Sequence, residues 1–494
     1  MALVRWLVIL GVVLDFCACK NSQATKIKTD LTPVVGSSCA DATHITLPID
    51  ASSSQTFSYF YLYSPGTAKS ASQPTVIALP GGPGSSNIAR LKDTRGFLPE
   101  EFNLLLIDAR GTGCNAGTTL LPSQYSSSLH AGDVAAVIAA ERAQRHIGQV
   151  ILLGHSYGSV TATLLGPMLP PEKTIAIVLE GTLGRAFQYG ERYEVYIKRW
   201  NKMIDDHPAL TDILAGPDGD TIGSRIYKVM RGAPIAWFDR EINDIIKNSG
   251  KSGPESQSSL YLWATSSVDA SVPSDAPKPH LGLTDAPGFA EIVNCRELHG
   301  FKDKMIPDKQ FKMSVVPATT DDCSKIGSLD QPYDSHKTKL ANPIYYVHGT
   351  EDAATPLKMM QYHRDGQKSS GVQISALILN DHAHDISGDA ALWPCLKQLW
   401  RSIALRKSFE FQGNDTEFQN TFCATKTTAQ DRAPTSTSSS GTAADGTKIS
   451  TDISCPGNRY CRDGWGWLND GDGGCSASSS SWKAEFKGCS CACG

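Results

Sequence analysis

Six short apolar segments, each bounded by turn-forming residues, constrain the fold of this chain more than any other feature. They cover residues 75–79, 103–108, 149–154, 174–180, 343–349 and 372–379. Most of them lack polar alternation, which is typical of strands covered on both faces of a sheet. Between two of them, residues 133–148 carry apolar side chains at helical spacing, and Asp133 at the start suits a helix N-terminus. Strand, helix and strand in this order predict an α/β fold with a mostly parallel sheet and right-handed crossovers.

The pattern changes between residues 185 and 340. This stretch begins with the helix-like "ERYEVYIKRWNKMIDDHPALTDIL" and continues with segments rich in proline, serine and glycine. An insertion of this length between two strands has to lie outside the sheet. We therefore expect a mostly helical cap at 185–340, with the core formed by residues 23–184 and 341–423.

Both ends of the chain carry segments that are separate from this core. Residues 1–22 have one arginine, an apolar run from Trp6 to Leu14 and then small residues, which is the pattern of a signal peptide. The apolar run is about half of the ~20 residues that span a bilayer, so secretion is favoured over a membrane anchor. Residues 424–453 form a Ser/Thr-rich linker, and residues 454–494 form a small Cys-rich module.

Charge and cysteine usage narrow the class of protein. A formal net charge of −4, with 40% hydrophobic and 19% charged residues, offers no basic surface for nucleic acid. Of the fourteen cysteines, two lie in the predicted signal peptide, six are dispersed and six are in the module. In an oxidising compartment they are expected to form disulfides rather than to bind metal. Asn414 lies in the one acceptor sequence for N-glycosylation.

Loop length suggests how the dispersed cysteines pair. Cys295 with Cys323 and Cys395 with Cys423 would each close a loop of about thirty residues, which leaves Cys39 with Cys114. The module cysteines allow fifteen pairings, and none is chosen. These are Cys455, Cys461, Cys475, Cys489, Cys491 and Cys493. Four aromatic residues of the module, Tyr460, Trp465, Trp467 and Trp482, would form either the core of this small domain or a face that binds a polysaccharide or surface ligand.

Two glycine-rich motifs follow predicted strands. The first, Gly154-His155-Ser156-Tyr157-Gly158, is a G-x-S-x-G sequence between a strand and a helix-like segment. This arrangement presents the serine at the carboxyl end of the sheet, where a helix N-terminus and the Tyr157 N–H can stabilise an oxyanion. The second, "ALPGGPGSS" at residues 78–86, exposes backbone amides at Gly81 and Gly82. A loop in this position is the usual source of the other oxyanion donor.

The order of these motifs resembles the α/β-hydrolase fold serine exopeptidases of the proline iminopeptidase and tripeptidyl aminopeptidase group. The similar segments span residues 55–425 and are "PGGPGSS", "LLLIDARGTGCN", "GHSYGS", "YYVHGTEDAATP" and "DHAHDISGDAALWPC". The resemblance implies an α/β-hydrolase fold, a mostly parallel sheet with helices on both faces, with a helical cap and an added disulfide-rich module. Pro80 stands where many relatives carry histidine, which affects subgroup placement more than chemistry.

The resemblance also implies roles for single residues. Ser156 matches the nucleophile, Asp352 the orienting acid and His384 the base, while Gly82 and Tyr157 match the oxyanion donors. Serine, aspartate and histidine follow in the chain order of this fold. Glu351 is the alternative acid. The chemistry of the loop alone does not distinguish His382 from His384 as the base. Only the resemblance selects His384.

The resemblance implies an aminopeptidase that releases single residues, dipeptides or tripeptides from peptide N-termini. Such an enzyme needs a carboxylate for the substrate's α-amino group, and Glu180, Glu191 and Glu194 are the candidates. No cofactor or metal is expected, because no further histidine motif accompanies "DHAHD". An esterase or lipase-like enzyme on the same fold and an inactive surface-binding protein are the alternatives.

Overall fold

The computed structural model describes most of the predicted core and part of the predicted cap. The described residues are 39–50, 54–68, 70–117, 120–144, 146–188, 191–219, 288–298 and 329–423, with positions 222, 223, 226, 239, 242, 243, 323, 326 and 327. All of them belong to one compact unit, made of residues 1–265 and 277–424. The predicted signal peptide, Ser/Thr-rich linker and Cys-rich module lie outside the described residues. None of the helices formed by the described residues combines the length and the apolar character needed to cross a bilayer.

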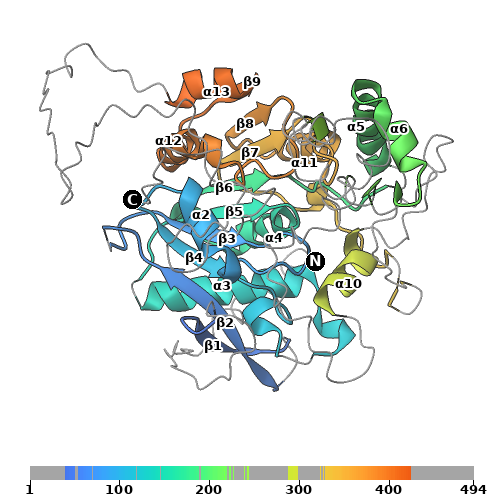
Figure 1. Ribbon diagram of the computed structural model, residues 1–494. Coiled ribbons are helices and arrows are strands. Elements are labelled where there is room, and N and C mark those ends of the chain that lie inside the picture. The colour runs from blue at the N-terminus through green and yellow to red at the C-terminus, as the bar shows by residue number, and fades with distance from the viewer. Residues whose placement is uncertain are drawn as a thin grey trace, which may run out of the picture. The chain divides into compact units, whose positions relative to one another are not determined.

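A single nine-stranded sheet in the order β1-β2-β4-β3-β5-β6-β7-β8-β9 forms the centre of this unit, with β1 and β9 at opposite ends (Figure 1). The strands are β1 Thr43–Pro48, β2 Thr56–Ser64, β3 Thr75–Leu79, β4 Asn103–Ile107, β5 Val150–His155, β6 Thr174–Glu180, β7 Ile344–Gly349, β8 Ile374–Leu379 and β9 Glu410–Gly413. All neighbours from β4 to β9 are parallel, whereas β2 is antiparallel to both β1 and β4. The six predicted strands correspond to β3–β8 within two residues at each end.

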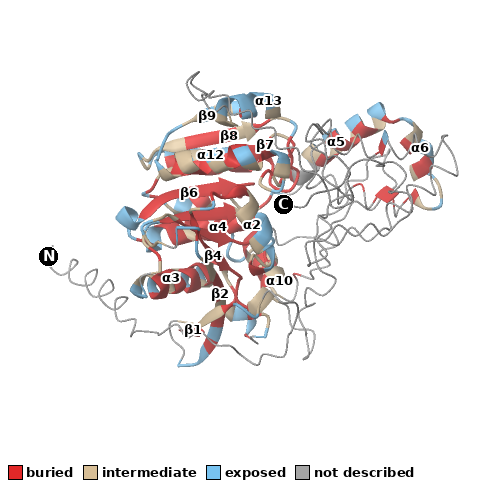
Figure 2. Ribbon diagram, turned by 60° about the vertical axis from the view of Figure 1, so that its left-hand side comes forward, coloured by how far each residue is buried: buried red, intermediate tan, exposed pale blue. Residues whose placement is uncertain are grey.

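Helices pack on both faces of the sheet and bury them, as Figure 2 shows for the central strands. The helices of the core are α2 Leu91–Phe97, α3 Ser127–Ala143, α4 Gly158–Leu165, α11 Leu357–Lys368, α12 Trp393–Ala404 and α13 Asp415–Phe418. One apolar core contains residues of α3, α4 and α11, and a second contains residues of α2 and α12. Double-sided burial explains why β3–β8 are mostly apolar and lack regular polar alternation.

Helix α3 begins earlier than the sequence pattern indicates. It runs from Ser127, and the Ser126 side chain caps it by accepting the N–H of Leu129 at 3.1 Å. Asp133, predicted to start the helix, lies inside it and forms a buried ion pair with Arg110 at 2.6 Å. Because the charged residue Asp133 lies on the inward face, it interrupts the apolar spacing of the helix. The first turns of α3 therefore could not be recognised from the sequence pattern. The prediction of a start at 133 was wrong for this reason.

Most of the described part of the insertion between β6 and β7 is helical, and an isolated β-bridge joins Arg185 to Asp334. This part contains α5 Glu191–Asp206, α6 Ala209–Leu214 and α10 Phe289–Val293, followed by a π-helical turn at Asn294–Leu298. Helix α5 buries Tyr196, Trp200 and Met203 at helical spacing. Arg199 of the same helix donates a hydrogen bond to the carbonyl oxygen of Glu351 at 3.0 Å, next to Asp352. This contact ties α5 to the loop after β7.

Disulfides join the three dispersed cysteine pairs that were expected from loop length. They are Cys39–Cys114, Cys295–Cys323 and Cys395–Cys423, with sequence separations of 75, 28 and 28 residues.

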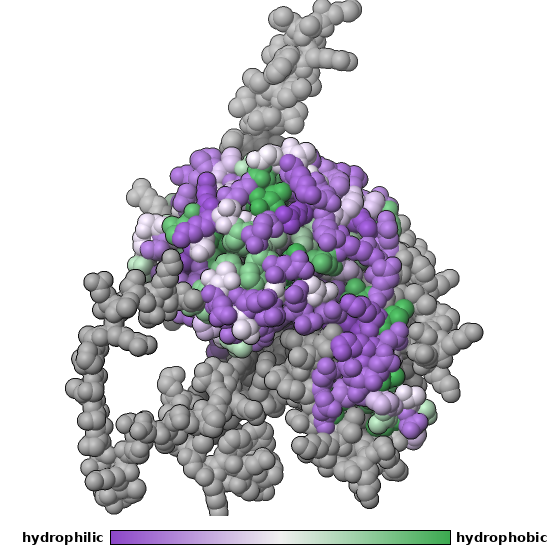
Figure 3. Space-filling model, turned by 90° about the horizontal axis from the view of Figure 1, so that it is seen from above, coloured by the Kyte–Doolittle hydropathy of each residue, from purple (hydrophilic) through white to green (hydrophobic). Residues whose placement is uncertain are grey.

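The face of the molecule in Figure 3 is mostly hydrophilic where residues are described, and its apolar groups are small and separated. Scattered apolar groups of this size are normal for a surface that faces water.

Candidate active site

Ser156 occupies a tight turn between β5 and α4. Its φ of 55° lies in the left-handed region, which non-glycine residues rarely adopt. A side chain at Gly158 would overlap the carbonyl oxygen of Leu79, and one at Gly154 would overlap the carbonyl oxygen of Gly158. Both glycines of the G-x-S-x-G motif are therefore required for the close approach of strand and helix. The Ser156 N–H donates to the carbonyl oxygen of Glu180 at 2.8 Å, which fixes the turn to β6.

Both segments that were predicted to supply oxyanion donors lie close to this turn. A Cβ added to Gly81 would lie 3.3 Å from the Ser156 Cβ, so the loop after β3 passes directly beside the serine. Gly82, the next residue, has a φ of 106°. Tyr157 directly precedes α4, and its buried ring hydroxyl is 2.8 Å from the Ser127 hydroxyl. The loop that carries Gly82 and the residue Tyr157 are therefore both next to Ser156.

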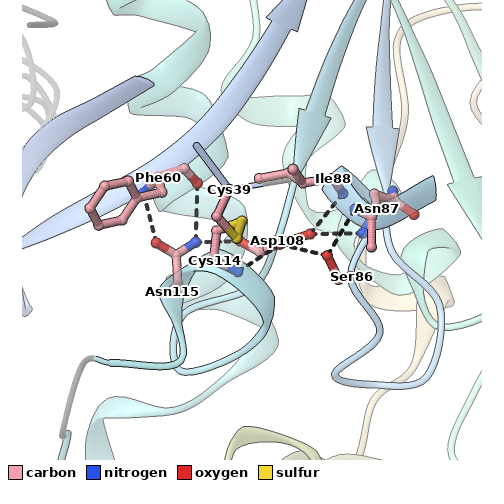
Figure 4. The surroundings of a disulfide bond; sticks show 9 residues. Cys39, Phe60, Ser86, Asn87, Ile88, Asp108, Cys114 and Asn115 are labelled. Atoms are coloured by element: carbon pink, nitrogen blue, oxygen red, sulfur yellow. Dashed lines mark hydrogen bonds between the residues drawn. A yellow bond between two sulfur atoms is a disulfide. The ribbon is translucent and has the colours of Figure 1, made fainter. Parts of the chain in front are cut away.

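Asp108 holds the far end of the loop after β3 (Figure 4). Its fully buried carboxylate accepts hydrogen bonds from the Ser86 hydroxyl at 2.8 Å, Asn87 N–H at 2.7 Å and Ile88 N–H at 3.2 Å. It also accepts the Cys114 N–H at 3.0 Å. Burial raises the pKa of Asp108, and these four donors oppose that rise. Asp108 therefore connects the loop beside Ser156 to the loop after β4.

The Cys39–Cys114 disulfide strengthens the same junction. Next to it, Asn115 accepts the Phe60 N–H at 2.7 Å and donates to the carbonyl oxygens of Phe60 and Asp108 at 3.1 and 3.0 Å (Figure 4). The disulfide and Asn115 thereby fix the loop after β4 to β2 and to the chain before β1. A role for Asp108 was not predicted from the sequence. Its one local signal was a carboxylate at the end of a buried strand, within the D-x-R-G-x-G segment.

Asp352 and His384 are hydrogen-bonded, with 2.8 Å between Oδ2 and Nδ1. Asp352 follows β7 and is fully buried. Its Oδ1 accepts the N–H groups of Ala354 and Thr355, both at 2.8 Å. The Thr355 hydroxyl donates to Oδ2 at 2.6 Å and lies 3.1 Å from His384 Nδ1. These contacts fix the carboxylate and leave Nε2 on the opposite side of the His384 ring.

A second imidazole, His348, lies behind Asp352. Its Nδ1 accepts the Thr182 N–H at 3.4 Å, so the proton belongs on Nε2, which is 3.6 Å from Asp352 Oδ2. Burial lowers the pKa of His348. Burial alone would raise the pKa of Asp352, but the charges of His384 and His348 and the hydrogen bonds from His384 and Thr355 outweigh it. The pKa of Asp352 therefore lies well below its usual range, and the carboxyl group is ionised.

The His384 ring lies beside the Ser156 turn. A Cβ on Gly181 would be 2.7 Å from its Cε1, and Gly181 directly follows Glu180, whose carbonyl oxygen holds the Ser156 N–H. The ring centroids of His384 and His155, the residue before Ser156, are 5.0 Å apart. The carboxyl ends of β5, β7 and β8 thus carry the predicted nucleophile, acid and base, and the structure brings them to one edge of the sheet.

The alternative residues have other partners. His382 is buried, and its Nε2 is 2.5 Å from an Asp415 carboxylate oxygen. The Glu351 carboxylate lies 3.6 Å from the Lys198 ammonium group. Asp352, not Glu351, is therefore the carboxylate that contacts His384.

The three carboxylates considered for a substrate amino group are all engaged by the protein. Glu180 is only 3% exposed and accepts the Ser387 N–H at 2.7 Å. Glu191 forms a two-point ion pair with Arg185, at 2.8 and 3.2 Å. Glu194 lies 2.9 Å from the Lys358 ammonium group. None of them is presented as an unpaired carboxylate toward the Ser156 turn.

Two groups of side chains within the described ranges bring three metal-type donors within 4.8 Å of one another. They are His155, Glu180 and Asp385, and His382, Asp389 and Asp415. In the first, Glu180 already accepts the Ser387 N–H, and Asp385 accepts the Gly388 N–H at 2.9 Å. In the second, His382 is bonded to Asp415 and Asp389 accepts the Ala391 N–H. Internal hydrogen bonds account for both groups, and we assign neither to a metal.

Comparison with known proteins gives one match to a family model and several weak structural similarities. Residues 74–209 match the family model of the alpha/beta hydrolase fold, a segment that includes the Ser156 turn. A proline iminopeptidase from Mycobacterium smegmatis is 14% identical and aligns over 74% of this chain and 99% of its own, with a TM-score of 0.40. A thermophilic esterase from Thermogutta terrifontis is 15% identical over 78% of this chain and 97% of its own, with a TM-score of 0.35. Among curated proteins, none matches the sequence.

Proposed function

We propose that this chain, which has the α/β-hydrolase fold, is a serine hydrolase with Ser156 as nucleophile, His384 as base and Asp352 as orienting acid. One observation carries the proposal. The buried Asp352–His384 pair, with 2.8 Å between Oδ2 and Nδ1, lies beside a serine held at positive φ between β5 and α4. A serine on a strained strand-to-helix turn, next to a histidine oriented by a buried carboxylate, is the arrangement on which nucleophilic catalysis by serine is built.

The proposed mechanism assigns one step to each part of the site. His384 Nε2 accepts the Ser156 proton as Oγ attacks the substrate carbonyl carbon, and Asp352 fixes the tautomer and stabilises the imidazolium. The N–H groups of Gly82 and Tyr157 stabilise the oxyanion. The imidazolium then gives its proton to the leaving group. Water activated by the same histidine hydrolyses the acyl-enzyme and restores the serine.

The proposed substrates are peptides, from which the enzyme releases single residues, dipeptides or tripeptides at the N-terminus. The order of five motifs along residues 55–425 supports this choice. The helical segments between β6 and β7 also support it, because α10 packs beside the Ser156 turn. Its Phe289 ring is 6.0 Å from the Tyr157 ring, centroid to centroid. A cap in this position can limit access to the ends of short chains.

An esterase is the second candidate. It is favoured by the observation that Glu180, Glu191 and Glu194 are each bonded within the protein, so none is available to bind an α-amino group without rearrangement. The same serine, histidine and aspartate cleave esters as well as amides. The two candidates therefore differ in substrate recognition and share one mechanism.

A substrate panel tests the proposal. Purified protein is assayed on aminoacyl, dipeptidyl and tripeptidyl anilides with a free or an acetylated N-terminus, and on short-chain p-nitrophenyl esters. We expect cleavage of the free anilides and a large loss on acetylation. Turnover of the esters without any anilide cleavage would identify an esterase instead.

We further propose that the protein is secreted and that residues 454–494 bind a polysaccharide or another surface ligand. The sequence of residues 1–22 and the three disulfides of the core support secretion. N-terminal sequencing of protein from the culture medium should start between residues 20 and 24. Co-sedimentation of the full chain with insoluble polysaccharides, compared with a chain that ends at residue 423, tests the second part.

A further inference from the structure

Glu180 contacts both the nucleophile turn and the base loop. It is the last residue of β6, and its neighbours in the sheet are His155 of β5 and Val347 of β7. Its backbone carbonyl oxygen accepts the Ser156 N–H at 2.8 Å. Its side chain accepts the N–H of Ser387, three residues after His384, at 2.7 Å. One residue therefore bonds to the segments that carry two members of the proposed triad.

The Glu180 side chain lines a pocket whose other lining residues are apolar except for Ser387. The apolar ones include Phe97, Leu153, Val178, Val347 and Leu396. Burial, reinforced by the charge of Asp385, raises the pKa of Glu180 to about 8. The carboxyl group is therefore mostly protonated at neutral pH, and an uncharged oxygen can accept the Ser387 N–H without a buried charge.

Both backbone polar groups of Ser387 are hydrogen-bonded. Its N–H donates to Glu180, and its carbonyl oxygen accepts the indole N–H of Trp393 at 2.8 Å. The segment between β8 and α12 that carries His384 is thereby fixed at the point where it turns back toward the helices. A side chain that is 3% exposed and engaged in this way is poorly placed to bind a substrate amino group.

We propose that Glu180 is a positioning residue that joins the Ser156 turn to the His384 loop and so sets the relative position of nucleophile and base. This inference rests on the proposed serine hydrolase mechanism. It replaces the expected role of Glu180 in binding the substrate's α-amino group. Displacement of catalytic groups by about 1 Å can cost on the order of 100-fold in rate, so the loss of this tether should be measurable.

The test compares Glu180→Leu with Glu180→Gln in the full-length protein. The readout is the second-order rate of labelling by a fluorophosphonate probe, which needs Ser156 and His384 but no peptide recognition. Leucine fills the apolar pocket without accepting the Ser387 N–H, and we expect labelling to fall about 10- to 100-fold. Glutamine keeps an uncharged acceptor, and its labelling rate at pH 7 should stay within about threefold of wild type.

A matched control is Glu141→Leu. Glu141 is also buried and accepts a hydrogen bond from the Tyr61 hydroxyl at 2.6 Å, but it lies in α3, away from the His384 loop. This variant should lose stability while its folded fraction labels at the wild-type rate. Equal labelling of folded Glu180→Leu and wild type would overturn the inference, as would equal losses in Glu180→Gln and Glu180→Leu.

A pH profile gives a second readout that still applies if Glu180→Leu does not fold. Ionisation of wild-type Glu180 above about pH 8 places a second charge near Asp385, so labelling should decline there. Glu180→Gln should lack this decline. The titratable and charged groups near Glu180 and Asp385 are His155 at the end of β5, His384 in the same loop, and Arg90 and Asp93 beside it. The same alkaline decline in both proteins would contradict the inference.

Different results contradict the proposed function and the role of Glu180. A wild-type protein that does not label at all contradicts the proposed function, and the tether then has no triad to position. A wild-type protein that labels, together with a folded Glu180→Leu variant that labels equally fast, contradicts only the role of Glu180.

Discussion

Replacement of Asp108 by asparagine tests how the loop beside Ser156 is held. The Asp108 carboxylate accepts four hydrogen bonds, and an asparagine has one oxygen in place of two. That oxygen can keep the N–H groups of Asn87 and Ile88. The new NH₂ group can donate to the Ser86 hydroxyl, but it opposes the Cys114 N–H donor to donor.

The structure gives the size of the effect. One N–H loses its acceptor, which costs about 1–3 kcal/mol, and the remaining bonds lose the added strength of a charged acceptor, about 0.5–1 kcal/mol each. With three bonds remaining, we therefore expect Asp108→Asn to lower the free energy of unfolding by about 2.5–6 kcal/mol. The loop at Gly81 and Gly82 should also become less fixed, with a loss of roughly 10-fold in the rate of hydrolysis.

Guanidinium chloride unfolding at pH 7 without reductant measures the first quantity, and hydrolysis rates on the best substrate of the panel measure the second. Ser86→Ala is the matched control, because it removes the hydroxyl that donates to Asp108 and accepts the exposed Ala89 N–H, but leaves the carboxylate in place, for a loss of about 1 kcal/mol. An Asp108→Asn protein within about 0.5 kcal/mol of wild type and with full activity would refute this account of the loop.

Three further predictions concern the site and its support. His384→Ala should lose about 1,000-fold or more in activity, while His382→Ala keeps most of it, measured as kcat/KM on one substrate; the reverse result would show that the base was misassigned. Because the pKa of Asp352 is lower in the folded than in the unfolded protein, its carboxylate contributes stability that is complete above about pH 4 and is lost as the pH falls further. Urea unfolding between pH 2 and 6 should therefore show that the free energy of unfolding falls less with decreasing pH in Asp352→Asn than in wild type. Arg110→Met leaves the Asp133 carboxylate buried without its ion pair and should cost about 3–5 kcal/mol in urea unfolding, and an unchanged midpoint would contradict that cost.

The sequence predicts the central strands because their environment is uniform. Each of β3–β8 is covered on both faces, so most of its residues are apolar and its limits are visible in the sequence. Strand β2, at the antiparallel end of the sheet, buries Phe57, Tyr59 and Tyr61 while the residues between them are less buried. The alternation in β2 and the shortness of β9 make both strands harder to recognise in the sequence than the apolar runs. Neither of them was predicted, and β1 was not predicted either.

The residues of the candidate site also differ in how far the sequence predicts them. Ser156 is marked by a local motif, because its strained turn requires glycines at fixed positions on both sides. Asp108 carries no such mark, since its partners in the loop after β3 are about twenty residues away in sequence. Glu180 at the end of a strand could face either the substrate or the core, and only packing shows that it faces the core. Long-range contacts of this kind follow from the fold and not from local sequence.

The most direct test of the central claim is peptide mapping by mass spectrometry after treatment of the native protein with a fluorophosphonate. The account predicts one adduct, on the peptide that contains Ser156, with no adduct in Ser156→Ala. A protein that forms no adduct, or an adduct on a different serine, would contradict the assignment of Ser156 as the nucleophile of a serine hydrolase.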